Sequence, residues 1–277
     1  IKFAPLPEDE IQSRISRIAS FSALATNGKG VRWILGCGGN DRLLSGQQAM
    51  ARVFDEAEVA YTSFVVPGVA HTSGLVMASP EYRPFIQAFS RDPEPHEVYY
   101  STAHLGHAER AWVRIEGMTA HYFLSSIHAV AAPDKGTLTI ETGGVERFSI
   151  RPSEKQAPRG KTKLIVDKQE IDLSGMGQWE ELLLARADEN WELATKENKI
   201  MRKHPGLQGP IADAFARPFL CVRPTGTPWY QDNRKYVDAL IAAVEARWSL
   251  NMQADLPIKD DVDVTAEDRQ NYDLVLF

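Results

Sequence analysis

The chain has 277 residues, of which 43% are hydrophobic and 25% are charged, and its formal net charge is -6 at pH 7. This composition is that of an ordinary globular protein, which excludes a disordered tail, a collagen-like repeat and a coiled coil. The negative charge and the lack of a lysine- or arginine-rich block argue against a nucleic-acid partner. The sequence contains no run of 18 or more apolar residues, so no membrane-spanning helix is predicted.

Both ends of the sequence are unusual for a complete protein. The chain begins at Ile1 with neither Met nor a signal-peptide pattern, and it ends on an apolar run over residues 274–277 that is typical of a buried strand. We therefore expect it to be part of a longer protein.

Residues 1–92 alternate helical and strand patterns. The predicted elements are a helix over 8–20, a strand over 31–37, a helix over 45–59 capped by Ser45, a strand over 61–66 and a helix over 80–89. Pro84 is expected to strain the last of these helices. Apolar strands separated by helices indicate an α/β layer with a parallel sheet.

Residues 96–200 contain short β-rich runs separated by polar turns, after a Pro-rich linker at 92–95. The predicted strands cover 98–102, 112–116, 121–130, 137–142, 148–151, 163–166, 170–173, 181–185 and 191–194. This spacing predicts an antiparallel β-sandwich. Trp112, Trp179 and Trp191 are expected to fill its core, with a sugar-binding aromatic platform as the weaker alternative.

Residues 204–277 return to the α/β pattern after a Gly/Pro-rich loop at 203–210. Strands are predicted over 219–222 and 274–277, with a helix over 232–248 between them. Thr265 and Asp268 have the spacing of a helix capping box. The complete fold prediction is thus a partial α/β sheet, a β-sandwich and a truncated α/β segment.

The strongest chemical signal is an acid and a histidine that follow neighbouring strands. Asp41 lies in a Gly-Gly-Asn-Asp loop after the first strand, and His71 follows the Pro67-Gly68 turn after the second. Loops at the carboxyl ends of parallel strands share one edge of a sheet, so these side chains should meet there. A carboxylate that accepts the Nδ1 proton of an imidazole fixes its tautomer and leaves Nε2 free to act as a base.

These motifs resemble the end of a prolyl oligopeptidase-like serine hydrolase domain of the α/β-hydrolase superfamily. The resemblance covers about residues 1–92 and rests on Gly38-x-x-Asp41, the helix over 47–59, the strand over 61–66 and Gly68…His71. The segments 206–215 and 219–226 resemble the region after that domain in some large bacterial members. The resemblance implies a Ser-Asp-His triad in which Asp41 and His71 are catalytic, no cofactor or metal, and a secreted or periplasmic location.

The nucleophile of that family is missing from this chain. No Gly-x-Ser-x-Gly occurs; the nearest string, around Ser174, lacks both glycines, and Ser73 is too close to His71 along the chain. The family order places the serine and the oxyanion-hole donors before Asp41. We therefore expect this chain alone to be inactive toward esters and amides.

Alternative interpretations remain open for each motif. Asp41 can simply cap local backbone amides, and His71 can be a loop residue packed on the sheet. His104, His107 and Glu109 lack the spacing of a zinc protease helix. The loop starting at Gly36 lacks the Lys-Ser/Thr of a phosphate loop. Cys37 and Cys221 are expected to be buried free thiols, and the acidic run at 260–263 to be a surface turn rather than a calcium site.

Three functions are compatible with this sequence. The first is a serine peptidase that acts on peptide or ester substrates through an acyl-enzyme. The second is a carbohydrate or acyl esterase of the same fold, because fold does not determine substrate. The third is a non-catalytic binding protein in which a degenerate hydrolase remnant supports the sandwich. The sequence gives no oligomeric state.

Overall fold

The fold is described from a computed structural model, which covers residues 20–88, 90–157, 162–173, 179–195, 202–209 and 211–277, together with Ser13 and Ser16. These residues form mixed sheets and five α-helices, and β-structure predominates. The chain divides into two compact units, residues 1–208 and 209–277. Apart from Ser13 and Ser16, which are helical, most of the predicted helix over 8–20 lies outside the described residues.

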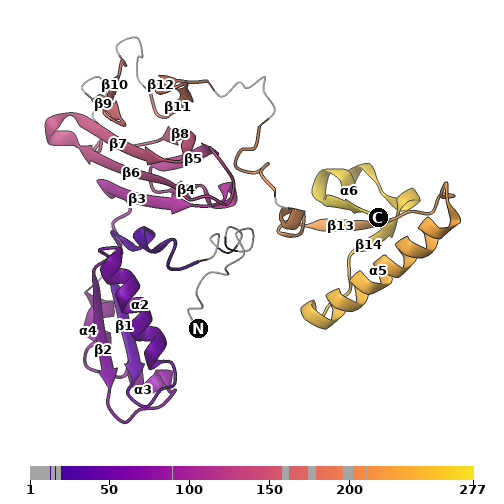
Figure 1. The fold of residues 1–277 in the computed structure, drawn as a ribbon, viewed down its shortest axis with the longest axis horizontal. Coiled ribbons are helices and arrows are strands. Elements are labelled where there is room, and N and C mark those ends of the chain that lie inside the picture. Colours follow the sequence, from indigo (N-terminus) through magenta and orange to yellow (C-terminus); the bar gives the residue numbers. More distant parts are fainter. Residues whose placement is uncertain are drawn as a thin grey trace. The chain divides into compact units, whose positions relative to one another are not determined.

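The first unit begins with two parallel strands joined by a helix (Figure 1). The elements are η2 (Ala25–Gly28), β1 (Trp33–Gly38), α2 (Leu44–Glu56), β2 (Tyr61–Val66), α3 (Ser73–Met77) and α4 (Tyr82–Gln87). Leu35 of β1 packs with Phe54 of α2 in one small core, whereas a side chain at Gly36 would meet Val76 of α3. Because successive strand residues point to opposite faces, α2 and α3 cover opposite faces of β1.

Two helix predictions need correction. Helix α2 begins at Leu44, so Ser45 lies within its first turn and does not cap it. Helix α4 is shorter than the predicted helix over 80–89, whose last residue lies outside the described residues. Pro84 is the third residue of α4, where the backbone N–H has no partner within the helix, so proline is tolerated there.

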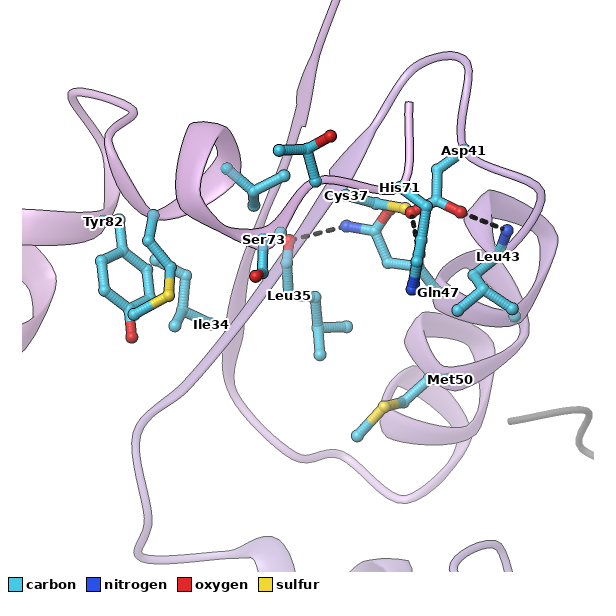
Figure 2. A pocket seen from close by; sticks show the side chains of 15 residues that line it. Ile34, Leu35, Cys37, Asp41, Leu43, Gln47, Met50, His71, Ser73 and Tyr82 are labelled. Carbon is cyan, nitrogen blue, oxygen red and sulfur yellow. Dashed lines mark hydrogen bonds and ion pairs between the residues drawn. The ribbon is translucent and has the colours of Figure 1, made fainter. Parts of the chain in front are cut away.

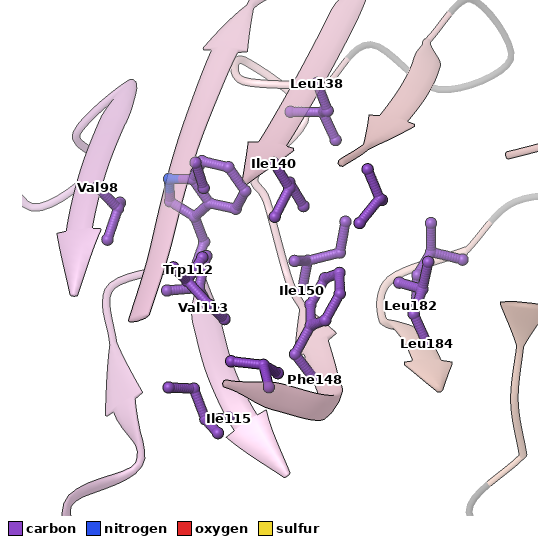
Figure 3. Packing of buried hydrophobic residues seen from close by; sticks show 14 of the residues in the cluster. Val98, Trp112, Val113, Ile115, Leu138, Ile140, Phe148, Ile150, Leu182 and Leu184 are labelled. Atoms are coloured by element: carbon purple, nitrogen blue, oxygen red, sulfur yellow. The ribbon is translucent and has the colours of Figure 1, made fainter. Parts of the chain in front are cut away.

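The rest of the first unit consists of two five-stranded sheets, in the orders β10-β9-β7-β6-β3 and β12-β11-β8-β5-β4. Their strands are β3 (Glu97–Thr102), β4 (Glu109–Arg110), β5 (Val113–Met118), β6 (Ser125–Ala132), β7 (Thr137–Gly143), β8 (Val145–Ile150), β9 (Lys163–Val166), β10 (Gln169–Ile171), β11 (Leu182–Ala187) and β12 (Asn190–Leu193). Both sheets contribute to one hydrophobic cluster (Figure 3). Trp112 and Trp191 are buried in it and Trp179 packs against it, as predicted.

The strand pairing differs from the prediction in two places. Strands β7 and β9 pair in parallel, so the first of these sheets is mixed rather than purely antiparallel. Strand β4 has only two residues and pairs with the start of β5. A sequence run that short carries no periodicity, and the partner of a strand is set by contacts far along the chain.

The second unit is a three-stranded parallel sheet with two helices. Its elements are η5 (Ile211–Phe215), β13 (Phe219–Arg223), α5 (Gln231–Met252), β14 (Ile258–Asp260), η6 (Asp261–Asp263), α6 (Ala266–Asn271) and β15 (Asp273–Leu276), and β13 is the central strand. The capping box of Thr265 and Asp268 at the start of α6 is confirmed. Cys37 and Cys221 are both buried free thiols, as predicted. None of the described helices combines the length and apolar character needed to cross a bilayer.

Candidate active site

Two loops meet at the carboxyl ends of β1 and β2. The Gly39 backbone N–H donates to the Val66 carbonyl at 2.8 Å, and the Asn40 N–H donates to the Val69 carbonyl at 2.9 Å. These bonds tie the loop that carries Asp41 to the loop that carries His71. The approach depends on Gly38, because a Cβ there would collide with the Val69 carbonyl oxygen.

The structure brings the two predicted site residues into direct contact (Figure 2). Nδ1 of His71 lies 2.9 Å from Oδ2 of Asp41, while Oδ1 of Asp41 accepts a hydrogen bond from the Leu43 backbone N–H at 2.9 Å. Asp41 therefore caps a local amide and holds the imidazole at the same time. Its side chain is only 8% exposed, whereas that of His71 is 66% exposed. Nε2 of His71 makes no hydrogen bond with any residue that the structure describes.

The hydrogen bonds favour the ionised form of the acid. The bond from the Leu43 amide, followed by that from His71, lowers the pKa of Asp41 below its usual value. The pKa of the neighbouring Cys37 thiol is shifted upward instead, by burial and then by the negative charge of Asp41. The site at neutral pH thus holds a carboxylate beside a protonated thiol, and Cys37 is a poor candidate for a nucleophilic thiolate.

A mostly apolar cavity of about 480 Å³ opens beside this pair. It is lined by Ile34, Leu35, Gly36, Cys37, Asp41, Leu43, Gly46, Gln47, Met50, His71, Thr72, Ser73, Val76, Met77 and Tyr82. Four consecutive residues of β1 line it, together with residues of α2 and α3 from opposite faces of that strand. We infer that the cavity runs along the edge of β1 that is not paired with β2.

The serines named in the sequence do not complete a triad here. Ser73 lines the cavity, but its hydroxyl makes no hydrogen bond with His71 among the described residues. Ser174 lies outside the described residues. The structure therefore shows an acid–histidine pair. Among the described residues, no hydroxyl is hydrogen-bonded to Nε2 of His71.

The other motifs have structural partners. Nδ1 of the buried His104 accepts a hydrogen bond from the Gly106 backbone N–H at 3.0 Å, and its ring centroid lies 6.2 Å from that of His107. In the acidic run, Asp260 pairs with Arg223 and Asp261 accepts bonds from Thr225. Across the described residues, no group of three or more His, Cys, Asp or Glu side chains is placed to hold a metal ion.

A second acid–imidazole pair was not predicted. Nε2 of His128 lies 2.9 Å from Oε1 of Glu97, and the His128 ring stacks on Tyr99 with 4.1 Å between centroids. Tyr99 and His128 are register partners on β3 and β6, so this is a cross-strand cluster within a sheet rather than a pair of loop residues. Only knowledge of the strand register would have indicated it.

Comparison of the chain with protein-family models, with curated proteins and with solved structures found no match. The interpretation of the site therefore depends on its geometry and on the motifs in the sequence.

Proposed function

We propose that Asp41 and His71 are the acid and the base of a Ser-Asp-His triad in a serine hydrolase resembling the prolyl oligopeptidase-like enzymes. The observation that carries the proposal is the 2.9 Å contact between Asp41 Oδ2 and His71 Nδ1, on loops at the carboxyl ends of neighbouring parallel strands. This is the edge at which open α/β sheets place their ligands. The substrates in this proposal are peptides or esters.

The proposed chemistry is set by the protonation pattern. The Asp41 carboxylate accepts the Nδ1 proton of His71, so the lone pair of the neutral imidazole is on Nε2. Nε2 takes the proton of the serine hydroxyl as its oxygen attacks the substrate carbonyl, and then gives that proton to the leaving amine or alcohol. Water repeats the sequence on the acyl-enzyme, with His71 again the base. Asp41 stabilises the imidazolium of His71 during both acylation and deacylation. The proposed mechanism uses no metal or cofactor.

The nucleophile in this scheme precedes Asp41, because α/β-hydrolases order their triads Ser, Asp, His along the chain. We place it on sequence that precedes Ile1, together with the strands that would extend the sheet beyond β1. The cavity along the unpaired edge of β1 supports this, since the described residues supply only two strands of a parallel sheet, and such sheets rarely stop at two strands. In this proposal the two five-stranded sheets form a β-sandwich accessory domain. Residues 209–277, rather than the predicted 204–277, form a further α/β accessory segment, because the turn at 204–208 belongs to the first unit.

A fluorophosphonate probe, which reacts with an activated serine, tests the proposal on a polypeptide that joins this chain to its preceding sequence. We expect the wild type to be labelled and His71→Ala to lose labelling by at least about a hundredfold. His128→Ala is the matched control, because it removes an imidazole held by Glu97 at the same 2.9 Å distance and should leave labelling unchanged. The chain of 277 residues alone should remain unlabelled.

Labelling of neither the wild type nor the variants would contradict the hydrolase proposal. Equal loss of labelling in both histidine variants would also count against it, because the effect would then be on folding rather than on a base. Labelling of the 277-residue chain itself would show that the nucleophile lies within it and would overturn its placement upstream.

A further inference from the structure

The first unit contains a second cavity, of about 510 Å³, which is distant in sequence from the Asp41 loop and lies on the β12-β11-β8-β5-β4 sheet. Its lining residues come from β5, from β8 and the residue after it, from β11 and the residue before it, and from the segment 202–205. They are Arg114, Glu116, Arg147, Arg151, Glu181, Leu183, Arg202, His204 and Pro205. Charged side chains thus make up most of the wall, in contrast to the apolar cavity beside β1.

Positive charge is in excess in this cavity. Among the described residues, four arginines and two glutamates line it, and their formal charges sum to +2 without the histidine. Arg114 lies 3.5 Å from Glu116, and Arg151 lies 3.5 Å from Glu181. Glu109, from the adjoining cavity, lies 4.0 Å from Arg114 and 3.8 Å from Arg151. Even with Glu109 included, one positive charge remains in excess.

Arg147 is the most deeply buried of the four arginines that line this cavity. It is 9% exposed, and its Nη2 donates to the Thr195 carbonyl. Among the described residues, no carboxylate lies within ion-pair distance of its guanidinium. Burial and then the positive charge of Arg202 lower the pKa of Arg147, and the Glu116 carboxylate opposes them only in part. A buried arginine without a directly paired carboxylate is uncommon, because removing its charge from water is costly unless an anion compensates.

Arg114 provides a second observation. Its Nε is buried and makes no hydrogen bond, although the Glu116 carboxylate lies 3.5 Å away. A buried guanidinium N–H without an acceptor costs free energy that a bound anion would recover. Arg114 and Arg147 reach the cavity from adjacent strands, β5 and β8, so the strand pairing holds their backbones at a set spacing.

The rest of the cavity wall is a turn at residues 204–207 that is closed by backbone hydrogen bonds. His204 and Leu207 exchange backbone hydrogen bonds of 3.2 and 2.9 Å, and Gly206 between them has a φ of +91°. The side chain of Gln208 accepts a bond from the Gly206 N–H at 2.7 Å. This turn lines both the arginine cavity and the adjoining one of about 360 Å³, which share Arg114 and Pro205.

We propose that the arginine cavity is a binding site for a small organic anion, held through a carboxylate or phosphate group by Arg114, Arg147 and the neighbouring arginines. Guanidinium groups bind such oxyanions with paired hydrogen bonds, and the cavity volume falls in the range of about 300 to 1,000 Å³ that small-molecule sites occupy. The site does not depend on the proposed hydrolase activity, because it shares no residue with the Asp41 cavity.

Calorimetric titration of the full chain with inorganic phosphate, and separately with acetate, tests the site. We expect saturable binding of at least one anion with a dissociation constant of about 1 mM or tighter. Phosphate alone would assign a phosphorylated ligand, and acetate alone a carboxylic acid. Arg147→Gln should weaken binding by at least about tenfold, whereas Arg52→Gln, which removes the same charge from the exposed surface of α2, should change it less than about twofold.

Two further variants keep the test decisive if Arg147→Gln does not fold. Arg151→Gln alters a side chain that is 46% exposed and should also weaken binding. Glu181→Gln removes a negative charge from the wall and should strengthen it. The proposal is overturned if neither anion binds saturably at about 10 mM, if Arg52→Gln weakens binding as much as the cavity variants, or if Glu181→Gln fails to strengthen it.

Discussion

Gly38 and Val69 approach so closely that no side chain fits between them. A Cβ on Gly38 would collide with the Val69 carbonyl oxygen and would lie 2.6 Å from that of Ala70. Both obstacles are backbone atoms, which cannot move aside as the end of a side chain can. The contact between the Asp41 and His71 loops thus depends on the absence of a side chain at residue 38.

Gly38→Ala should therefore separate the two loops and break the Asp41–His71 hydrogen bond. We expect the loss of the low-field Nδ1 proton resonance of His71 and a destabilisation of about 1 to 3 kcal/mol, the range of an overpacked site. Gly74→Ala, in α3, is the matched control, because a Cβ there meets nothing within 4 Å. It should leave the resonance in place. An unchanged His71 spectrum in Gly38→Ala would contradict this account of the loops.

Asp41→Asn tests the acid without removing the turn. The remaining amide oxygen can still accept the Leu43 N–H, so circular dichroism should be unchanged. In the hydrolase proposed above, turnover should fall by about 10⁴-fold, because an asparagine no longer fixes the tautomer of the imidazole. Asp55→Asn, which alters an exposed carboxylate of α2 bonded to Tyr61, should retain turnover. Equal turnover in Asp41→Asn and wild type would remove Asp41 from the mechanism.

The sequence predicts those elements whose signals are local. Strand β2 was found with its correct bounds, because a run of β-branched and aromatic residues stops at Pro67-Gly68. The strands β4 and β14 have two and three residues, too few for a period to appear. The parallel pairing of β7 with β9 depends on contacts between distant segments, which no local pattern encodes.

The two candidate sites differ for the same reason. Asp41 and His71 belong to one strand–helix–strand unit, whose geometry places the ends of both strands at one edge. The residues of the arginine cavity extend from 114 to 205 over three strands and a turn, so only the sheet register brings them together. The fold also places Cys37 beside the Asp41 carboxylate, whereas the sequence predicted only a buried thiol.

The core of the two five-stranded sheets offers a matched pair of substitutions. Leu184 on β11 is 0% exposed, whereas its register partner Leu193 on the edge strand β12 is 38% exposed. Leu184→Ala should destabilise the first unit by about 2 to 5 kcal/mol, because it leaves a cavity in a closely packed cluster. Leu193→Ala should cost less than about 1 kcal/mol. Urea unfolding of both variants measures the difference, and equal losses would contradict the assigned core.

The acid stability of the second unit should depend on Asp268. Hydrogen bonds from Lys259 and then from Thr265 lower the pKa of Asp268 to about 2. Because the folded pKa lies below the unfolded value of about 3.9, the stabilisation is fully present above that value and is lost as the pH falls toward 2. Asp268→Asn should thus be less stable than wild type at pH 6, and the gap should close at low pH.

Urea unfolding followed through NMR resonances of α6 measures this pH dependence. Asp263→Asn, which alters an exposed carboxylate in the same unit, controls for the loss of one negative charge. A gap between Asp268→Asn and wild type that persists unchanged at pH 2 would contradict the assigned hydrogen bonds.

Asn27 should couple the first parallel strands to the sheet that contains β3. Its side-chain amide donates to the Ser101 carbonyl at 2.7 Å, and its side-chain oxygen accepts from the Ser101 N–H at 2.6 Å. Since β3 is an edge strand, Asn27 supplies the pairing that a further strand would otherwise provide. Asn27→Ala should expose the Ser101 amide and cost about 1 to 3 kcal/mol of local stability. Amide hydrogen exchange at Ser101 should accelerate by at least about fivefold. Exchange at Ile140, inside the same sheet, should remain at the wild-type rate. Unchanged exchange at Ser101 would contradict this coupling.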